Sequence, residues 1–107
     1  MTKYKCACCG EYTLTMPTGY YDECDNCGWV DDNVQNKYID FRGGPNTISL
    51  REAQEIYKRA IQENLDPAGE IQKADRYAYE NWNEEEEKEK LYKSYPEMRY
   101  RKPPTIK

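Results

Sequence analysis

The residues of this chain best suited to chemistry are its five cysteines, all between positions 6 and 27. Four of them form two C-x-x-C-G patterns separated by 14 residues, Cys6 with Cys9 and Cys24 with Cys27. The two-residue gap lets both sulfurs of a tight turn reach one ion, and the following glycine accepts the backbone conformation that aims amide N–H groups at the thiolates. We therefore expect two knuckles, one at each end of a hairpin, that hold one structural Zn²⁺ through these four cysteines.

The donor set favours zinc, because four soft thiolates occur in a chain that has no histidine. Iron in a rubredoxin-like site is the alternative metal, and a labile redox site or free thiols are the other interpretations. The fifth cysteine, Cys8, lies between two ligands, and we expect it to point outward or to pack as a small apolar group. A redox-sensing role for Cys8 is the alternative.

An enzymatic role is not expected. A catalytic zinc site keeps an open position for water, usually beside three protein ligands, whereas four cysteines close the shell. The sequence has no histidine to act as a general base and no glycine-rich phosphate loop. The acidic pair Asp31 and Asp32 could bind a cation or act in catalysis, but such residues more often cap the turn that leaves a knuckle.

The composition limits the size of the hydrophobic core. Only 13 of the 107 residues are Ile, Leu, Val or Phe, a share typical of charged chains that do not fold on a core alone. Eleven Tyr, two Trp and a metal site could supply the difference. The sequence shows no apolar stretch long enough to span a membrane and no signal peptide. Its five cysteines are odd in number and clustered, which is unlike a disulfide-bonded secreted protein. We therefore expect a cytoplasmic protein. An integral membrane protein and a large enzyme with a deep apolar pocket are excluded.

The segments around the cysteines carry strand and loop signals. Residues 12–15 and 20–21 are β-prone and flank a loop that contains Pro17 and Gly19, which predicts a hairpin. Residues 31–47 are rich in Asp, Asn and Gly, and we expect them to form a loop.

Two helices are predicted after this loop. Ser49 and Glu52 have the spacing of a capping box, and apolar residues then recur at three- and four-residue steps until the Asp66–Gly69 stretch. A second, acidic helix is expected over 69–94, and Pro96 should end it. The predicted fold class is α+β: a small zinc ribbon packed on helices, with an acidic C-terminal helix.

The chain is expected to have two parts. Residues 1–62 form a zinc-ribbon-like domain with its first helix, and residues 63–107 form a helical extension that ends in a basic, proline-containing tail. The tail, residues 97–107, carries a net charge of +3, so the other 96 residues carry −7 of the total of −4. We expect the tail to be extended because of its Pro-Pro pair.

Several motifs together resemble one known family. They are Cys6–Gly10, Tyr12–Leu14, Gly19–Tyr21, the Cys24/Cys27 pair, Trp29, Asp31–Asp32, Val34–Gln35, Gly43–Asn46 and Ile48–Ala53. Over about residues 4–62, the sequence resembles the bacterial cysteine-rich family named for its Cys-Pro-Cys-Cys signature. Ala7 stands at the signature proline, Gly28 replaces an expected bulky residue, and Pro45 replaces an expected alanine.

The resemblance implies a small bacterial zinc-binding module. Its metal ligands would be Cys6, Cys9, Cys24 and Cys27. A second set of residues is implied as a candidate interaction surface, with packing and turn formation as the alternative interpretation. This set consists of Trp29, Asp31, Asp32, Gln35 and Asn46.

The favoured function is a non-catalytic protein-interaction module, with an immunity or antitoxin-type inhibitor of a toxin as its specific form. The chain is small and acidic, with a pI near 4.9. Tyrosine supplies rigid contact area with a hydrogen-bonding tip, and a negative surface steers association with a basic partner such as a nuclease toxin. Solvated acidic helices and core tyrosines would explain the same composition without a partner.

The alternative function is a nucleic-acid-binding zinc ribbon that acts in transcription or translation. Phosphate contacts need clustered Lys and Arg, but residues 1–30 carry two basic residues against four acidic ones. Only the tail interleaves stacking and basic side chains, at Arg99, Tyr100, Arg101 and Lys102. Nucleic acid is therefore the less favoured partner. A redox or metal-handling role that uses Cys8 is a third hypothesis.

Overall fold

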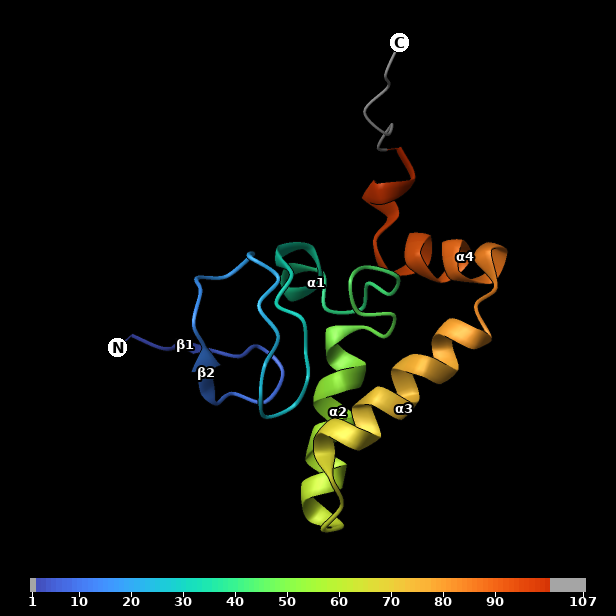
Figure 1. Cartoon of the computed structure of the whole chain (residues 1–107). Coiled ribbons are helices and arrows are strands. Elements are labelled where there is room, and N and C mark those ends of the chain that lie inside the picture. The colour runs from blue at the N-terminus through green and yellow to red at the C-terminus, as the bar shows by residue number, and fades with distance from the viewer. Residues whose placement is uncertain (1, 101–107) are drawn as a thin grey trace.

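The cysteine-bearing ribbon lies on one side of the molecule and the long helices lie on the other (Figure 1). The computed structural model describes residues 2–100. Its elements, in chain order, are β1 (Tyr4–Lys5), β2 (Tyr12–Leu14), α1 (Asn33–Lys37), α2 (Leu50–Gln62), α3 (Pro67–Glu80), α4 (Glu84–Ser94) and a 3₁₀ helix, η1 (Pro96–Tyr100). The predicted α+β class, with a cysteine-bearing hairpin beside helices, is confirmed.

The strands pair differently from the prediction. β1 runs antiparallel to β2, with Tyr4 opposite Leu14 and Lys5 opposite Tyr12. The hairpin predicted between residues 12–15 and 20–21 is therefore wrong. The first cysteine knuckle is itself the turn that joins the two strands, so the proline-containing loop is not needed to reverse the chain.

The segment 31–47 contains a short helix where only a loop was predicted. Asp32 is the N-cap of α1, and its Oδ2 accepts a hydrogen bond from the Gln35 amide at 2.9 Å. A helix of five residues is too short to show a helical hydrophobic period in the sequence. The interpretation of Asp32 as a capping residue at the exit of the knuckle is confirmed.

The predicted start of α2 is confirmed. The Ser49 Oγ accepts a hydrogen bond from the Glu52 amide at 3.2 Å, and Glu52 Oε1 accepts one from the Ser49 amide at 2.9 Å. These two bonds form the complete capping box. The apolar face is shorter than the periodicity indicated, because Ile61 and Leu65 are exposed at its end.

The single acidic helix predicted over 69–94 is wrong, because the chain forms two helices there. Asn81 is the C-cap of α3, and Asn83 is the N-cap of α4 through its Oδ1, which accepts from the Glu86 amide at 3.1 Å. Asparagine side chains bond the ends of helices more readily than they fit helix interiors. α3 also begins earlier than predicted, with Pro67 at its first position.

One core joins the ribbon to the helices. It comprises Cys6, Cys8, Leu14, Cys24, Cys27, Trp29, Ile48, Leu50, Ala53, Ile71 and Ala78. Ile71 and Ala78 come from α3, so the part of the chain after residue 62 contributes to the same core as the ribbon. Tyr77 of the same helix is exposed.

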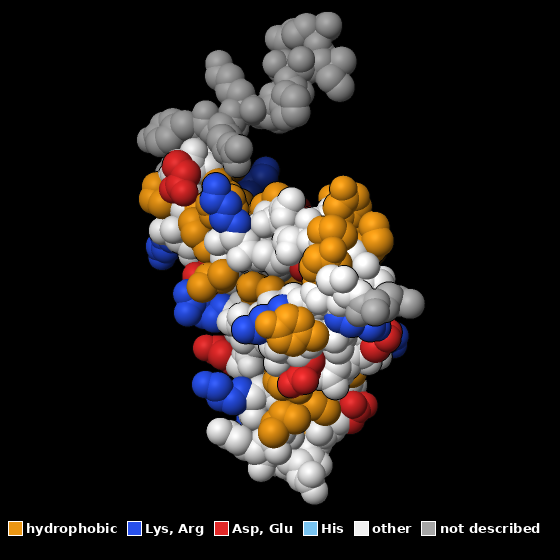
Figure 2. Space-filling view, turned by 90° about the vertical axis from the view of Figure 1, so that its left-hand side faces the viewer, with side chains coloured by type: hydrophobic (Ala, Val, Ile, Leu, Met, Phe, Trp, Pro, Cys, Tyr) orange, Lys and Arg blue, Asp and Glu red, His pale blue; other side chains and the backbone are white. Residues whose placement is uncertain are grey.

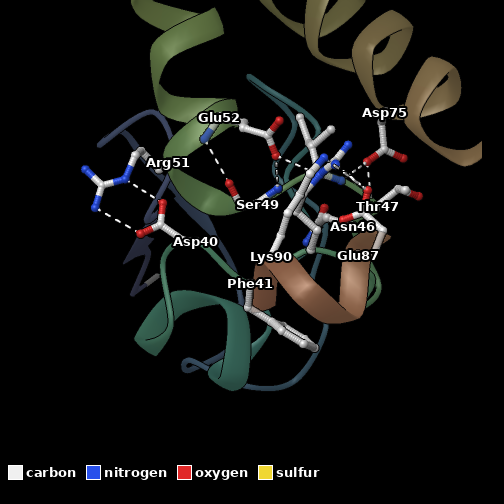
Figure 3. A network of polar contacts seen from close by, with 12 residues as sticks. Asp40, Phe41, Asn46, Thr47, Ser49, Arg51, Glu52, Asp75, Glu87 and Lys90 are labelled. Atoms are coloured by element: carbon white, nitrogen blue, oxygen red, sulfur yellow. Dashed lines mark hydrogen bonds and ion pairs between the residues drawn. The ribbon is translucent and has the colours of Figure 1, made fainter. Parts of the chain in front are cut away.

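Helix α4 is held to the rest of the molecule through the loop that precedes α2. The Arg42 guanidinium lies 2.6 Å from Glu87 of α4 and 3.1 Å from Glu52 of α2, and it stands over the Trp82 ring. Figure 3 shows Glu52, Glu87 and their neighbours converging at this junction. Gly43 has a φ of +94°, and a Cβ there would come within 2.9 Å of the Trp82 ring. The loop and the α3–α4 corner therefore contact each other closely.

The remaining expectations on the C-terminal part are tested only to residue 100. α4 ends at Ser94, before Pro96, as predicted. The expected extended, basic end of the tail, including its Pro-Pro pair, lies in residues 101–107, outside the described residues. Within residues 2–100, no helix combines the length and the apolar character that crossing a membrane requires.

Candidate metal centre

Four of the five cysteines converge on one point beside the hairpin. The Sγ atoms of Cys6, Cys9, Cys24 and Cys27 all lie within 4.8 Å of one another. The Cys6–Cys27 and Cys9–Cys24 sulfur pairs are each 3.7 Å apart, and each pair joins the two knuckles. In a regular tetrahedron with metal–sulfur bonds of about 2.3 Å, the ligands are about 3.8 Å apart. The four cysteines are therefore positioned to bind one metal ion.

The two knuckles have the same backbone construction. In the first, Gly10 donates its N–H to the Cys6 carbonyl at 2.9 Å, and in the second Gly28 donates to the Cys24 carbonyl at 2.8 Å. Gly10 and Gly28 have φ values of +81° and +84°, a region that other residues rarely adopt. The predicted role of the glycine in each C-x-x-C-G pattern is confirmed. The bulky residue expected at position 28 would be strained there.

Hydrogen bonds to sulfur are concentrated on Cys24. Its Sγ lies 2.9 Å from the Thr13 hydroxyl and accepts the amides of Asn26 and Cys27 at 3.3 and 3.4 Å. Burial raises the pKa of Cys24, but these bonds outweigh burial and hold the pKa below its ordinary value. No sequence spacing linked Thr13 to Cys24, so its role could be found only from the structure.

The thiols of Cys6 and Cys9 are harder to ionise than an ordinary cysteine before a metal binds. The hydrogen bond with Cys27 and burial both raise the pKa of Cys6, and burial also raises the pKa of Cys9. A divalent metal would have to displace these protons, because metals bind the thiolate form. Four sulfur donors in a tetrahedral arrangement fit zinc or iron. They would fill all four coordination positions of the ion, so none would be left for water or a substrate.

Cys8 is not part of this group. It is buried in the core beside the knuckles, and its sulfur is not among the four that converge. The expectation that it packs as a small apolar side chain is confirmed. Its burial within the ribbon explains how a fifth cysteine is accommodated without changing the number of ligands.

The candidate interaction surface is corrected by the structure, because all five of its residues are buried. Trp29, Asp31 and Gln35 have at most 1% of their surface exposed, and Asp32 and Asn46 have 6% and 7%. Packing and turn formation, the alternative interpretation of these residues, account for their positions. With so little surface exposed, these five residues do not form an exposed interaction surface.

Gln35 and Asn46 form a buried amide pair that ties α1 to the loop before α2. The Gln35 Nε2 donates to the carbonyls of Phe41, Asn46 and Ile48 at 3.0 to 3.2 Å, and its Oε1 accepts from the Asn46 amide and side chain. Gly44 lies against this side chain, where a Cβ would come within 2.8 Å of Gln35.

Asn46 also connects this network to the second knuckle. Its Oδ1 accepts the Val30 N–H at 2.9 Å and its Nδ2 donates to the Val30 carbonyl at 2.8 Å. The side chain thus pairs with Val30 as a neighbouring strand would. Gln35 and Asn46 together hold the exit of the knuckle in place.

Trp29 and Asp31 are joined through a residue that the sequence did not single out. The Trp29 Nε1 donates to Asn36 Oδ1 at 3.0 Å, and Asn36 Nδ2 donates to Asp31 Oδ1 at 2.7 Å. The second Asp31 oxygen accepts the Gly19 amide at 3.2 Å. The Asp31 carboxylate therefore fixes the loop before the second knuckle against α1.

Replacing Gln35 with methionine should destabilise the fold. Gln35→Met keeps the approximate volume but leaves three buried carbonyls without their donor, and we expect it to lower the free energy of unfolding by about 3 kcal/mol. Val34→Ala, at an exposed position of the same helix, should change it by no more than about 0.5 kcal/mol. Urea unfolding followed by circular dichroism measures both. Equal stability of the two variants would show that the amide network is not a major source of stability.

The ligand set predicts which cysteines matter for metal content. The double variant Cys24→Ala with Cys27→Ala should contain no tightly bound metal and should lose cooperative unfolding, because site binding energy becomes folding energy in a small metal domain. Cys8→Ala should retain one ion per chain and a cooperative transition. Elemental analysis and thermal unfolding provide the two readouts. Equal damage from both changes would mean that Cys8 belongs to the ligand set.

The sequence matches the family described as Cysteine-rich CPCC over residues 4–75, about two thirds of the chain. The matched range includes both knuckles, α1, α2 and the first part of α3, and it extends beyond residue 62, where the sequence resemblance was expected to end. A search of curated proteins finds no match. The chain reads Cys-Ala-Cys-Cys at the family signature, and it belongs to the cysteine-rich CPCC family.

Proposed function

We propose that this chain is a zinc-stabilised, non-catalytic protein-interaction module. The observation that supports it is the convergence of four cysteine sulfurs at distances that match the edges of a tetrahedral thiolate site. Three of the four ligands are buried, and all four positions of a tetrahedral ion would be taken by the protein. When bound, the ion would link the two knuckles. This arrangement favours a structural metal over a catalytic one.

Zinc is the proposed ion, and iron is the alternative. The protein should contain close to one zinc per chain after growth in medium that holds both metals, and it should be colourless. Elemental analysis and a visible absorption spectrum distinguish the two, because ferric thiolate sites absorb visible light and zinc, with a filled d shell, does not. Mutation of Cys8 provides the matched control, since it removes a cysteine outside the site. A coloured protein with one iron per chain would contradict the zinc assignment.

The exposed residues favour a protein partner of basic character. Figure 2 views the ribbon side of the molecule and shows hydrophobic side chains, a class that includes tyrosine, exposed in several patches on that face. Tyr12, Tyr20 and Tyr21 are among the exposed large side chains of the ribbon. Residues 6–36 contain six acidic residues and no Lys or Arg, and four of the six, Glu11, Asp22, Glu23 and Asp25, are at least partly exposed. Exposed tyrosines within a negative segment are typical of a surface that binds a positively charged protein.

An inhibitor of a basic toxin, of the immunity or antitoxin type, is the specific form of this proposal. Such an inhibitor needs a stable fold, a complementary surface and no catalytic group of its own. The cytosol is the compartment proposed for it, because a reducing environment keeps thiolate ligands from forming disulfides.

Nucleic acid is the alternative partner. The observation in its favour is the alternation of basic and aromatic residues from Arg99 to Lys102, of which the last two lie outside the described residues. The ribbon itself carries too few cations to neutralise phosphates. A protein partner is therefore preferred.

Affinity capture from lysate of the source cell tests the proposal. The zinc-loaded protein should retain one stoichiometric basic protein, and the Cys24→Ala, Cys27→Ala variant should lose it because the ribbon no longer folds. Nuclease treatment of the lysate is the control and should leave capture unchanged. Nucleic acid in the eluate that moderate salt releases would instead favour the alternative partner.

A further inference from the structure

A groove lies between the second knuckle and α3, next to the candidate metal centre. It has a volume of about 590 Å³, within the range of small-molecule and side-chain pockets. Its knuckle side includes Glu23, Asp25 and Val30, and its α3 side includes Ala68, Ile71 and Asp75. All of these positions fall within the part of the chain that matches the family. We call it the knuckle groove.

The charges of the knuckle groove have one sign. Three of its lining residues are acidic, and no Lys or Arg is among the described residues that line it. Glu23, Asp25 and Asp75 form none of the ion pairs found within residues 2–100. The negative charge of the groove is therefore not neutralised by the protein itself.

Asp75 is held in a fixed position at the edge of this groove. Its Oδ1 accepts the amides of Thr47 and Ile48 at 2.7 and 3.1 Å, and Figure 3 shows Asp75 directed at Thr47. Amide donors orient the carboxylate without cancelling its charge. The groove thus contains one preorganised carboxylate from α3 and two more exposed ones from the knuckle.

The walls of the knuckle groove suit the stem of a long basic side chain. Ile71, Ala68 and Val30 supply apolar surface between the acidic residues. Arg and Lys bury their methylene stems against such surface while their charged ends meet carboxylates. Cys24 and Cys27 also line the groove. Four thiolates around one divalent ion would add a further net charge of −2 beside it.

A second, slightly larger groove does not have this property. It has a volume of about 630 Å³ and lies between the loop before α2 and helix α4. Two of its carboxylates are already paired, Glu87 with Arg42 and Asp40 with Arg51, and Lys88 and Lys90 also line it. Its charges are therefore largely balanced within the chain.

We infer that the knuckle groove receives an arginine or lysine side chain from a basic segment of a partner protein. This inference rests on the proposed function and names the chemistry of the partner and the place where it binds. The occupant is chosen by charge complementarity, because three uncompensated carboxylates attract a cation and repel a phosphate. The apolar part of the lining, from Val30, Ala68 and Ile71, favours a cation on a long stem over a free metal ion.

A peptide titration tests the inference on the intact, zinc-loaded chain. Hexa-arginine is the probe, and nitrogen-15 NMR records which backbone amides shift. We expect the largest shifts in residues 23–30 and 68–75. The double variant Glu23→Gln, Asp25→Asn should bind at least tenfold more weakly, and added salt should weaken binding of the original protein.

Two further variants separate a built site from general charge attraction. Glu84→Gln with Glu85→Gln removes the same charge from α4, away from the groove, and should weaken binding less than twofold. Ala68→Leu narrows the groove without changing any charge and should weaken binding at least fivefold, with zinc content confirming that the variant is folded. Shifts spread equally over α4, or equal losses in the two charge variants, would overturn the inference.

The same variants distinguish this inference from the proposed function. A basic protein captured equally by the original chain and by Glu23→Gln, Asp25→Asn would leave the proposed function standing and refute the groove as its site. If hexa-arginine shifts only residues of the groove and Ala68→Leu weakens its binding, the inference is supported whether or not the lysate contains the natural partner.

Discussion

The four cysteine sulfurs can meet only because both knuckles reverse the chain in the same way. In each knuckle a glycine with positive φ returns its amide to the carbonyl of the first cysteine, which leaves the two sulfurs on the same side of the turn. The small core is arranged around this point, with Leu14 and Trp29 as its largest fully buried hydrophobic side chains. A chain so poor in aliphatic residues depends on this cluster because few other groups are buried deeply enough to replace it.

The buried polar residues extend this order from the ribbon to the helices. Asp32 caps α1, Gln35 holds the loop carbonyls, and Asn46 pairs with Val30 at the end of the second knuckle. Each group has its hydrogen-bond partners within the protein, so its burial does not carry the cost of an unsatisfied polar group. These side chains fix the position of α2, whose capping box begins three residues after Asn46.

α3 contributes both to the core and to the knuckle groove. Ile71 and Ala78 complete the core, while Asp75 both anchors the loop before α2 and forms one edge of the knuckle groove. A single helix face therefore stabilises the ribbon and shapes the adjoining acidic groove. This double role is consistent with a family match that continues to residue 75, beyond the end of α2.

Local patterns in the sequence identified the four candidate metal-binding cysteines, the glycine turns, the α2 capping box and the elements of an α+β fold. The capping box and each C-x-x-C-G turn involve residues within a few positions of one another, so they can be recognised without the folded structure. The tertiary structure alone decided the strand pairing and the burial of Trp29, Asp31 and Gln35. Polar residues of this kind look the same in a sequence whether they face solvent or a buried carbonyl. Their partners come from distant segments, so only the folded chain shows that they are internal supports and that the acidic groove lies beside them.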